Sequence, residues 1–174
     1  MNIMNIMNIM NIMNIMKKKV KFSTYSTIIT VIILAALIGI LCWQAYENIG
    51  WAIWALFGVI VLFCSLALFY APVSISVDDR YLNINRTLRT KKIPLTEIKT
   101  AELCPPTVAE KRICGSGGFF GYWGHFTEPS IGKYFAYYGK ASDCFLITLT
   151  NNKKYLLGCQ NAPEIITVIT SRLK

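Results

Sequence analysis

Glycine-rich segments can hold phosphates, so the string GSGGFFGYWG at residues 115–124 is the first candidate for chemistry. A nucleotide-binding glycine loop lies between a strand and a helix, and a P-loop ends in GK[ST]. Here aromatic residues follow the glycines, and no GK[ST] is present. The string instead predicts a tight, aromatic-packed hairpin in which glycines adopt positive φ or let backbones approach closely. A second interpretation is an aromatic surface for lipid or a partner, made of Phe119, Phe120, Tyr122, Trp123 and Phe126.

Residues for catalysis or metal binding lack the necessary groupings. His125 is the only histidine, and neither a serine motif nor a paired carboxylate accompanies it. The acidic residues are scattered without the spacing of metal ligands, and the six cysteines form no CxxC pair. We therefore expect a non-catalytic protein without cofactor or metal, whose cysteines are free, mostly buried thiols in a reducing cytoplasm.

Basic residues give a stronger binding hypothesis, because the formal net charge is +9. Each cation near an anionic membrane surface contributes roughly 1 kcal/mol. The cations expected to face lipid are Lys17, Lys18, Lys19, Lys21 and, in a loop between early strands, Arg86, Arg89, Lys91 and Lys92. The alternative is a solvated loop without special function. Nucleic acid is not an expected partner, since no motif for it is present.

Two long apolar segments predict a membrane hairpin. Residues 22–46 carry no charge, and neither do residues 50–71. A helix needs about 20 residues to cross the hydrocarbon layer, so both are long enough. Neither contains Asp, Glu, Lys, Arg or His, which ion pathways usually need, so we expect an anchor rather than a carrier. A cleaved signal peptide over residues 16–45 is the alternative, but no small-x-small cleavage site follows it.

Flanking residues predict the orientation of this hairpin. Tryptophan and tyrosine, which favour headgroup regions, surround the short connection at residues 44–50. Lysines precede the first segment and basic residues follow the second, whereas the connection carries only Glu47. By the positive-inside rule, both termini are expected in the cytoplasm.

Residues 1–16 repeat Met-Asn-Ile five times before Met16. A three-residue period fits neither an amphipathic helix nor an alternating strand. We expect this low-complexity segment to be disordered or not translated, with Met16 as an alternative start.

Residues 73–174 predict a small domain of strands and one helix. VSISVDDRYLNIN (73–85) is typical of strand, turn and strand, and IPLTEIKTAEL (93–103) of one extended strand. Further strands are expected at 133–138, 144–150 and 155–159. A final helix begins at Asn161, with Glu164 completing a capping-box pattern, and one apolar face holds Ile165, Ile166, Ile169 and Leu173.

These segments, with the GGFFGYWGHF run, GKYFAYYG and CFLITLTNNKKYLLG, resemble the pleckstrin-homology (PH)-like fold. More specifically, they are similar to bacterial PH domains attached to paired transmembrane helices. The resemblance implies a membrane α-hairpin plus an α+β cytoplasmic domain, an antiparallel β-barrel or curled sheet capped by the C-terminal helix. It also implies a binding or scaffolding role at the bacterial cytoplasmic (inner) membrane. The expected partners are the lipid bilayer and another membrane protein or a second copy. The alternative is an accessory subunit of a transporter or membrane enzyme.

Overall fold

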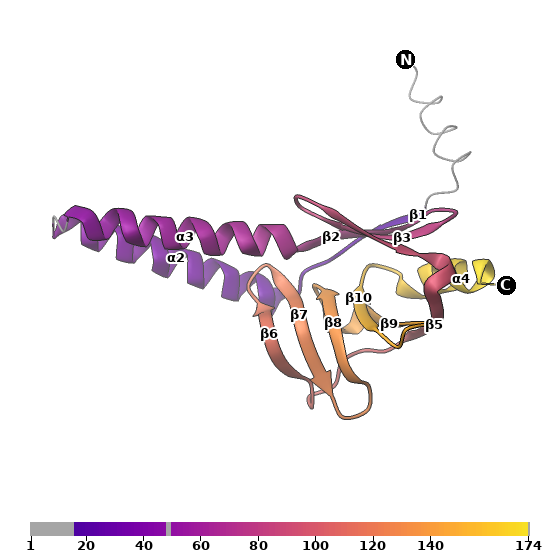
Figure 1. Cartoon of the computed structure of the whole chain (residues 1–174). Coiled ribbons are helices and arrows are strands. Elements are labelled where there is room, and N and C mark those ends of the chain that lie inside the picture. The colour runs from indigo at the N-terminus through magenta and orange to yellow at the C-terminus, as the bar shows by residue number, and fades with distance from the viewer. Residues whose placement is uncertain (1–15, 48–49, 174) are drawn as a thin grey trace, which may run out of the picture.

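Two apolar helices extend side by side from a β domain in the structure, a computed structural model that describes residues 16–47 and 50–173 (Figure 1). Helix α2 spans Thr24–Tyr46 and α3 spans Gly50–Tyr70. Both expose valine and aromatic side chains, together with isoleucine in α2 and leucine in α3, and both are long enough to cross a membrane. Helices that are apolar all round and unburied indicate membrane association. The low-complexity segment predicted at 1–16 lies outside the described residues, except for Met16, which begins a strand.

A strand that the sequence did not predict precedes the first helix. Strand β1 (Met16–Lys19) pairs antiparallel with β2 (Pro72–Val77), which follows the second helix. The helical hairpin is therefore inserted between two paired strands. The domain predicted at 73–174 gains a strand from the lysine run that was expected only to flank a helix.

The β domain contains two sheets. The first has the order β1-β2-β3-β4, with β3 at Tyr81–Arg86 and β4 at Thr90–Pro94. The second has the order β5-β9-β10-β8-β7-β6. Its strands are β5 Ile98–Leu103, β6 Lys111–Gly118, β7 Gly121–Glu128, β8 Gly132–Tyr138, β9 Cys144–Leu149 and β10 Lys154–Gly158. Only the β8–β10 pair is parallel among the described pairings. These strands form two curled sheets and not a closed barrel.

The prediction of a single strand at 93–103 is wrong. Strand β4 ends at Pro94, a 3₁₀ turn occupies Leu95–Glu97 (η1), and β5 continues in the other sheet. A second 3₁₀ turn (η2) spans Ala141–Asp143, before β9. The turn at η1 lets the chain pass from one sheet to the next, so Leu95 and Ile98 both remain buried.

The C-terminal helix α4 (Ala162–Arg172) completes the main core, as predicted. Ile165 and Ile169 are fully buried against both sheets, and Ile166 and Leu173 pack at the edge of the same cluster. Asn161 is the N-cap, but its side chain donates to Glu164 and not to the helix backbone. The capping-box pattern therefore marks the start of the helix through a contact between side chains.

All six cysteines lie among the described residues and are free, yet only Cys144 and Cys159 are buried. The expectation of mostly buried thiols is wrong for the other four. Burial raises the pKa of Cys159 to about 12, with the nearby Asp143 acting in the same direction.

Candidate membrane interface and binding clefts

The turn between β6 and β7, residues 118–121, contacts the first turns of α2. The Ser26 hydroxyl donates to Gly118 O at 2.5 Å and accepts from Gly121 N at 3.1 Å. Phe120 N donates to the Thr30 hydroxyl at 3.0 Å. Ser26 is only 1% exposed, so its two hydrogen bonds to the turn are shielded from solvent. The hydroxyls of one helix thus satisfy the backbone of a turn from a distant part of the chain.

The local sequence explains this arrangement. Residues 23, 26 and 30 share one face of a helix, and each carries a hydroxyl. Ser23 is the N-cap and accepts from Ser26 N at 3.1 Å, while its own N–H donates to Gly139 O at 2.9 Å. Sequence reasoning missed these residues. The available signal was the string STYSTIIT, which places polar groups at the domain end of an otherwise apolar segment.

The hairpin predicted from the glycine-rich string is confirmed. Gly115 and Gly124 face each other across β6 and β7, each with φ of +125°. A Cβ on Gly124 would lie 2.2 Å from Cys114 O, so only glycine allows this approach. Phe120 in the turn has φ of 51°, a left-handed conformation rare for a bulky residue.

The aromatic residues predicted as one surface separate onto different faces. Phe119 and Phe120 are half-buried at the turn and contact edge to face at 4.9 Å. Trp123 stacks on Tyr70, the last residue of α3, at 5.2 Å. Tyr122 stacks on Tyr138 at 4.6 Å.

Phe126 is 3% exposed and belongs to a core cluster, because the even-numbered residues of β7 face inward. Its assignment to a partner surface is therefore wrong.

The predicted basic residues also separate. Arg86 lies over Phe69 and Tyr70 at the end of α3, 5.2 and 5.6 Å from the ring centroids, and its Nε donates to Arg89 O. Lys91 and Lys92 lie on β4, opposite Ile84 and Asn83, and not in a loop as predicted. The loop that remains is only residues 87–89.

The lysines before α2 lie on or directly after β1. Lys18 pairs with Glu164 of α4, whereas Lys17, Lys19 and Lys21 are exposed. Lys21 is three residues before the first residue of α2. Of the eight predicted cations, Lys21 and Arg86 therefore lie nearest the helix ends.

A cleft of about 480 Å³ gathers lysines from several elements and is here called the lysine cleft. Lys91 Nζ donates to the Tyr155 hydroxyl at 2.9 Å, and His125 packs on Phe135. The other lining residues include Lys133, Lys153 and Lys154, and none is acidic. The sequence did not indicate this cleft, because its lysines come from separate strands. Four cations without a lining carboxylate suit an anionic ligand.

A second cavity, of about 600 Å³, lies between the helices and the β6–β7 hairpin and is here called the membrane-side groove. Its walls are apolar side chains of α2 and α3, together with Phe119 and Trp123. Arg112 of β6 is the only charged residue in its lining.

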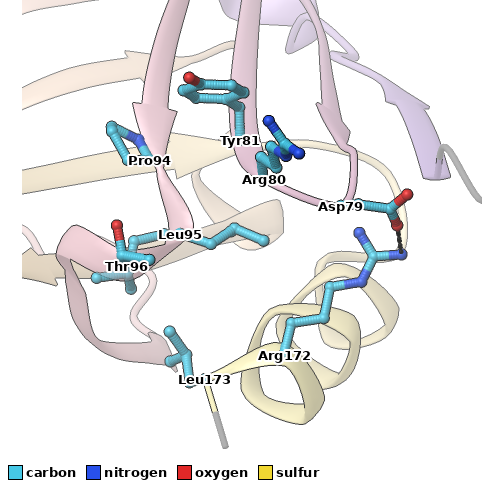
Figure 2. Close-up of a pocket in the computed structure, with 9 residues that line it drawn as sticks. Asp79, Arg80, Tyr81, Pro94, Leu95, Thr96, Arg172 and Leu173 are labelled. Carbon is cyan, nitrogen blue, oxygen red and sulfur yellow. Dashed lines mark ion pairs between the residues drawn. The ribbon is translucent and has the colours of Figure 1, made fainter.

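A third cavity, of about 640 Å³, lies at the end of the domain opposite the helices and is here called the distal pocket (Figures 1 and 2). Arg172 of α4 forms an ion pair with Asp79 at 3.3 Å along one side, and Tyr81, Leu95 and Thr96 complete the wall. This pocket mixes charged and apolar side chains, as protein-binding surfaces often do.

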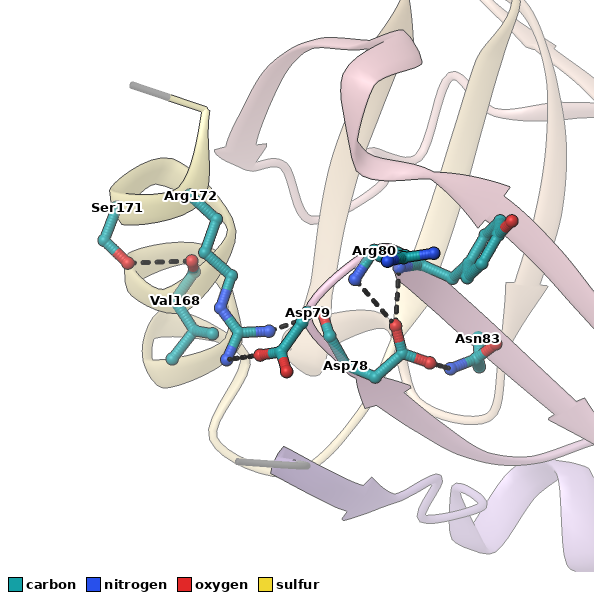
Figure 3. A network of polar contacts seen from close by, with 8 residues as sticks. Asp78, Asp79, Arg80, Asn83, Val168, Ser171 and Arg172 are labelled. Atoms are coloured by element: carbon teal, nitrogen blue, oxygen red, sulfur yellow. Dashed lines mark hydrogen bonds and ion pairs between the residues drawn. The ribbon is translucent and has the colours of Figure 1, made fainter. Parts of the chain in front are cut away.

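Asp78 organises the turn beside this pocket, as the sequence predicted for the Asp78-Asp79-Arg80 turn (Figure 3). Its carboxylate accepts from the backbone N–H of Arg80 and Tyr81 at 2.9 and 2.6 Å, and from Asn83 Nδ2 at 2.8 Å. Burial opposes ionisation of Asp78, but these hydrogen bonds outweigh it and hold its pKa below the usual value.

We expect Asp78→Ala to lower the free energy of unfolding by about 1 kcal/mol at pH 7, since the three hydrogen bonds are partly exposed. A lowered pKa in the folded state stabilises above the unfolded pKa of about 3.9 and loses this effect as pH falls through the folded value. The difference between variant and wild type should therefore shrink below about pH 4. Denaturant unfolding in detergent at pH 7 and pH 3 measures it.

Asp79→Ala is the matched control, because it removes only an ion pair whose carboxylate is largely exposed. We expect it to change stability by a few tenths of a kcal/mol. An effect of Asp78→Ala that is equal at both pH values would contradict the role of its charge.

Among the described residues, no group of three or more histidine, cysteine, aspartate or glutamate side chains could hold a metal ion.

Comparison with known proteins bears directly on the fold. The sequence model of the bacterial PH domain family matches residues 73–173, more than half of the chain. No curated protein and no solved structure matches the chain. The matched segment runs from β2 to the end of α4 and so contains both sheets except β1. The chain therefore belongs to the bacterial PH domain family.

Proposed function

We propose that this protein is a non-catalytic scaffold of the bacterial cytoplasmic membrane, a two-span protein with both termini in the cytoplasm. Its PH domain binds another membrane protein or a second copy close to the bilayer. The observation that carries the proposal is the insertion of the helical hairpin between the paired strands β1 and β2. PH domains are generally binding modules, and this one is joined to its anchor at two points.

A third, non-covalent contact supports a fixed position of the domain. The turn at 118–121 is hydrogen-bonded to Ser26 and Thr30 of α2, and Trp123 stacks on Tyr70 of α3. The domain can therefore neither swing freely about a linker nor move away from the helices without breaking buried hydrogen bonds. Such rigidity suits a module that presents its distal pocket at a constant height.

Purification of the full chain from membranes in a mild detergent tests the proposal. We expect resistance to alkaline carbonate extraction and one stoichiometric partner, either a membrane protein or a second copy, in the purified complex. Tyr81→Ala in the distal pocket should reduce that stoichiometry, whereas Lys140→Ala, exposed outside the cavities described above, should not. Isolation as a partner-free monomer would contradict scaffolding, and turnover of any substrate would contradict a non-catalytic role. A transporter or membrane enzyme as the partner would favour the accessory-subunit alternative.

Recognition of an anionic lipid is a second candidate function, favoured by the lysine cleft and by Lys21 and Arg86 at the helix ends. The full chain must be used, because a fragment starting at residue 73 would lack β1. In nanodiscs, we expect Lys133→Gln to weaken retention of phosphatidylglycerol relative to phosphatidylcholine, with exposed Lys99→Gln as the control. Equal retention of the two lipids by the wild-type protein would contradict this candidate.

A further inference from the structure

The turn at residues 118–121 lies beside α2 at a depth that belongs to the bilayer, provided that the helices span it as proposed. Thr30 is six residues beyond Thr24, the first residue of α2, which is about 9 Å along the axis. With its 23 residues, α2 is about 35 Å long, against a hydrocarbon layer of about 30 Å. The hydrogen bond from Phe120 N to Thr30 therefore lies within the cytoplasmic leaflet.

The turn has the properties that such surroundings require. Irregular backbone at membrane depth must have its polar groups satisfied within the protein, because no water is available there. Gly118 O, Phe120 N and Gly121 N all find partners on Ser26 or Thr30. The two side chains at the tip are Phe119 and Phe120, which favour an apolar environment.

The membrane-side groove opens next to this turn. Val59 and Phe63 of α3 and Ile33 of α2 line one wall, and Phe119 and Trp123 line the other. Its volume of about 600 Å³ falls in the range of roughly 300–1,000 Å³ typical of small-molecule sites. Since both walls stand in the leaflet, the molecules that surround the groove are lipids.

The single charge of the groove belongs to β6. Arg112 is exposed on β6, its guanidinium lies near Gly117, and it forms no ion pair within the described part of the chain. A guanidinium binds phosphate through two parallel hydrogen bonds. An apolar groove with one arginine in its lining complements a phospholipid, whose chain is apolar and whose phosphate is anionic.

We propose that the membrane-side groove binds one phospholipid of the cytoplasmic leaflet, with an acyl chain between α3 and the β6–β7 hairpin and the phosphate at Arg112. This site is distinct from the lysine cleft and rests on the proposed membrane-spanning role of the helices. The bound lipid covers the apolar walls and connects the β6–β7 hairpin to α3. The hydrogen bonds of the 118–121 turn connect this hairpin only to α2.

Photo-crosslinking tests the site in the full chain, reconstituted in nanodiscs with phosphatidylglycerol that carries a diazirine in one acyl chain. We expect lipid adducts on peptides of β6–β7 and of α3 near Val59. Val59→Trp fills the groove and should reduce adducts on β6–β7 at least five-fold. Val61→Trp is the matched control, because Val61 is equally exposed on α3 (47% against 49%) but does not line the groove.

Arg112→Gln tests the headgroup contact. In the wild-type protein, β6–β7 should form more adducts with phosphatidylglycerol than with phosphatidylcholine. The variant should lose at least half of that preference. Lys111→Gln, the exposed neighbour outside the groove lining, should keep it.

Three outcomes would overturn the lipid site. The first is an equal amount of β6–β7 adducts in the two tryptophan variants, and the second is a preference for phosphatidylglycerol that Arg112→Gln does not change. The third is crosslinking of the groove to a second protein chain. Failure of the proposed function is a different result. In that case the wild-type protein would be released by alkaline carbonate, whatever the groove variants show.

Discussion

Gly124→Ala is expected to destabilise the domain by more than about 3 kcal/mol, because strain at positive φ adds to a backbone clash. The new Cβ would lie 2.2 Å from Cys114 O and 2.7 Å from Gly115 Cα. Neither atom belongs to a flexible side chain, so β6 would have to separate from β7. Denaturant unfolding in detergent measures the loss, and the tryptophan signal from the Trp123–Tyr70 stack should change in the folded baseline.

Gly132→Ala provides the control. Gly132 also has positive φ, +82°, but an added Cβ would meet nothing within 4 Å. We expect only the conformational cost of about 1–2 kcal/mol. Equal losses in the two variants would mean that close approach of the strands is not the reason for glycine at position 124.

The sequence predicted those parts of the fold that depend on local patterns. Uncharged apolar segments identified both helices within two residues, and alternation identified β2, β3, β9 and β10. Strand β1 has no such pattern: Met16–Lys19 is three lysines after a methionine, and its partner lies beyond the whole helical hairpin. A short stretch of sequence does not indicate which distant segment it will pair with.

The break between β4 and β5 did leave a trace in the sequence. Ile93 and Leu95 are two residues apart, as one face of a strand requires, but the next buried residue is Ile98. A spacing of three puts Ile98 out of phase with a continuous strand. The 3₁₀ turn at Leu95–Glu97 restores its burial.

The candidate sites were less predictable because they combine segments far apart in the chain. Alternation along β7 could have separated Phe126 from Trp123, since odd and even residues face opposite ways. No pattern could place Lys91 beside Lys133 and Lys154, because this depends on how β4 of one sheet lies against β8 and β10 of the other. Likewise, Ser26 is an ordinary first-turn serine until the 118–121 turn is placed against it.

Ser26→Ala is expected to have the second large effect, a loss of about 2 kcal/mol in the free energy of unfolding, because it leaves Gly121 N without its partner. Gly118 O keeps only the long contact to Thr30, at 3.4 Å. Faster hydrogen exchange at Gly121 should accompany the loss. Thr27→Ala is the matched control, since its hydroxyl is exposed and donates to Ser23 O within the same helix.

The bilayer decides how the Ser26 result should be interpreted. Water can replace the lost hydroxyl if the turn at 118–121 is accessible to it, but not if the turn lies in the leaflet. Ser26→Ala should therefore accelerate exchange at Gly121 more in detergent than in nanodiscs, while lowering stability more in nanodiscs. Helix insertion should remain intact, because replacing a serine by alanine makes α2 slightly more apolar. Equal losses of stability in both environments would place the turn in water and would contradict its proposed depth.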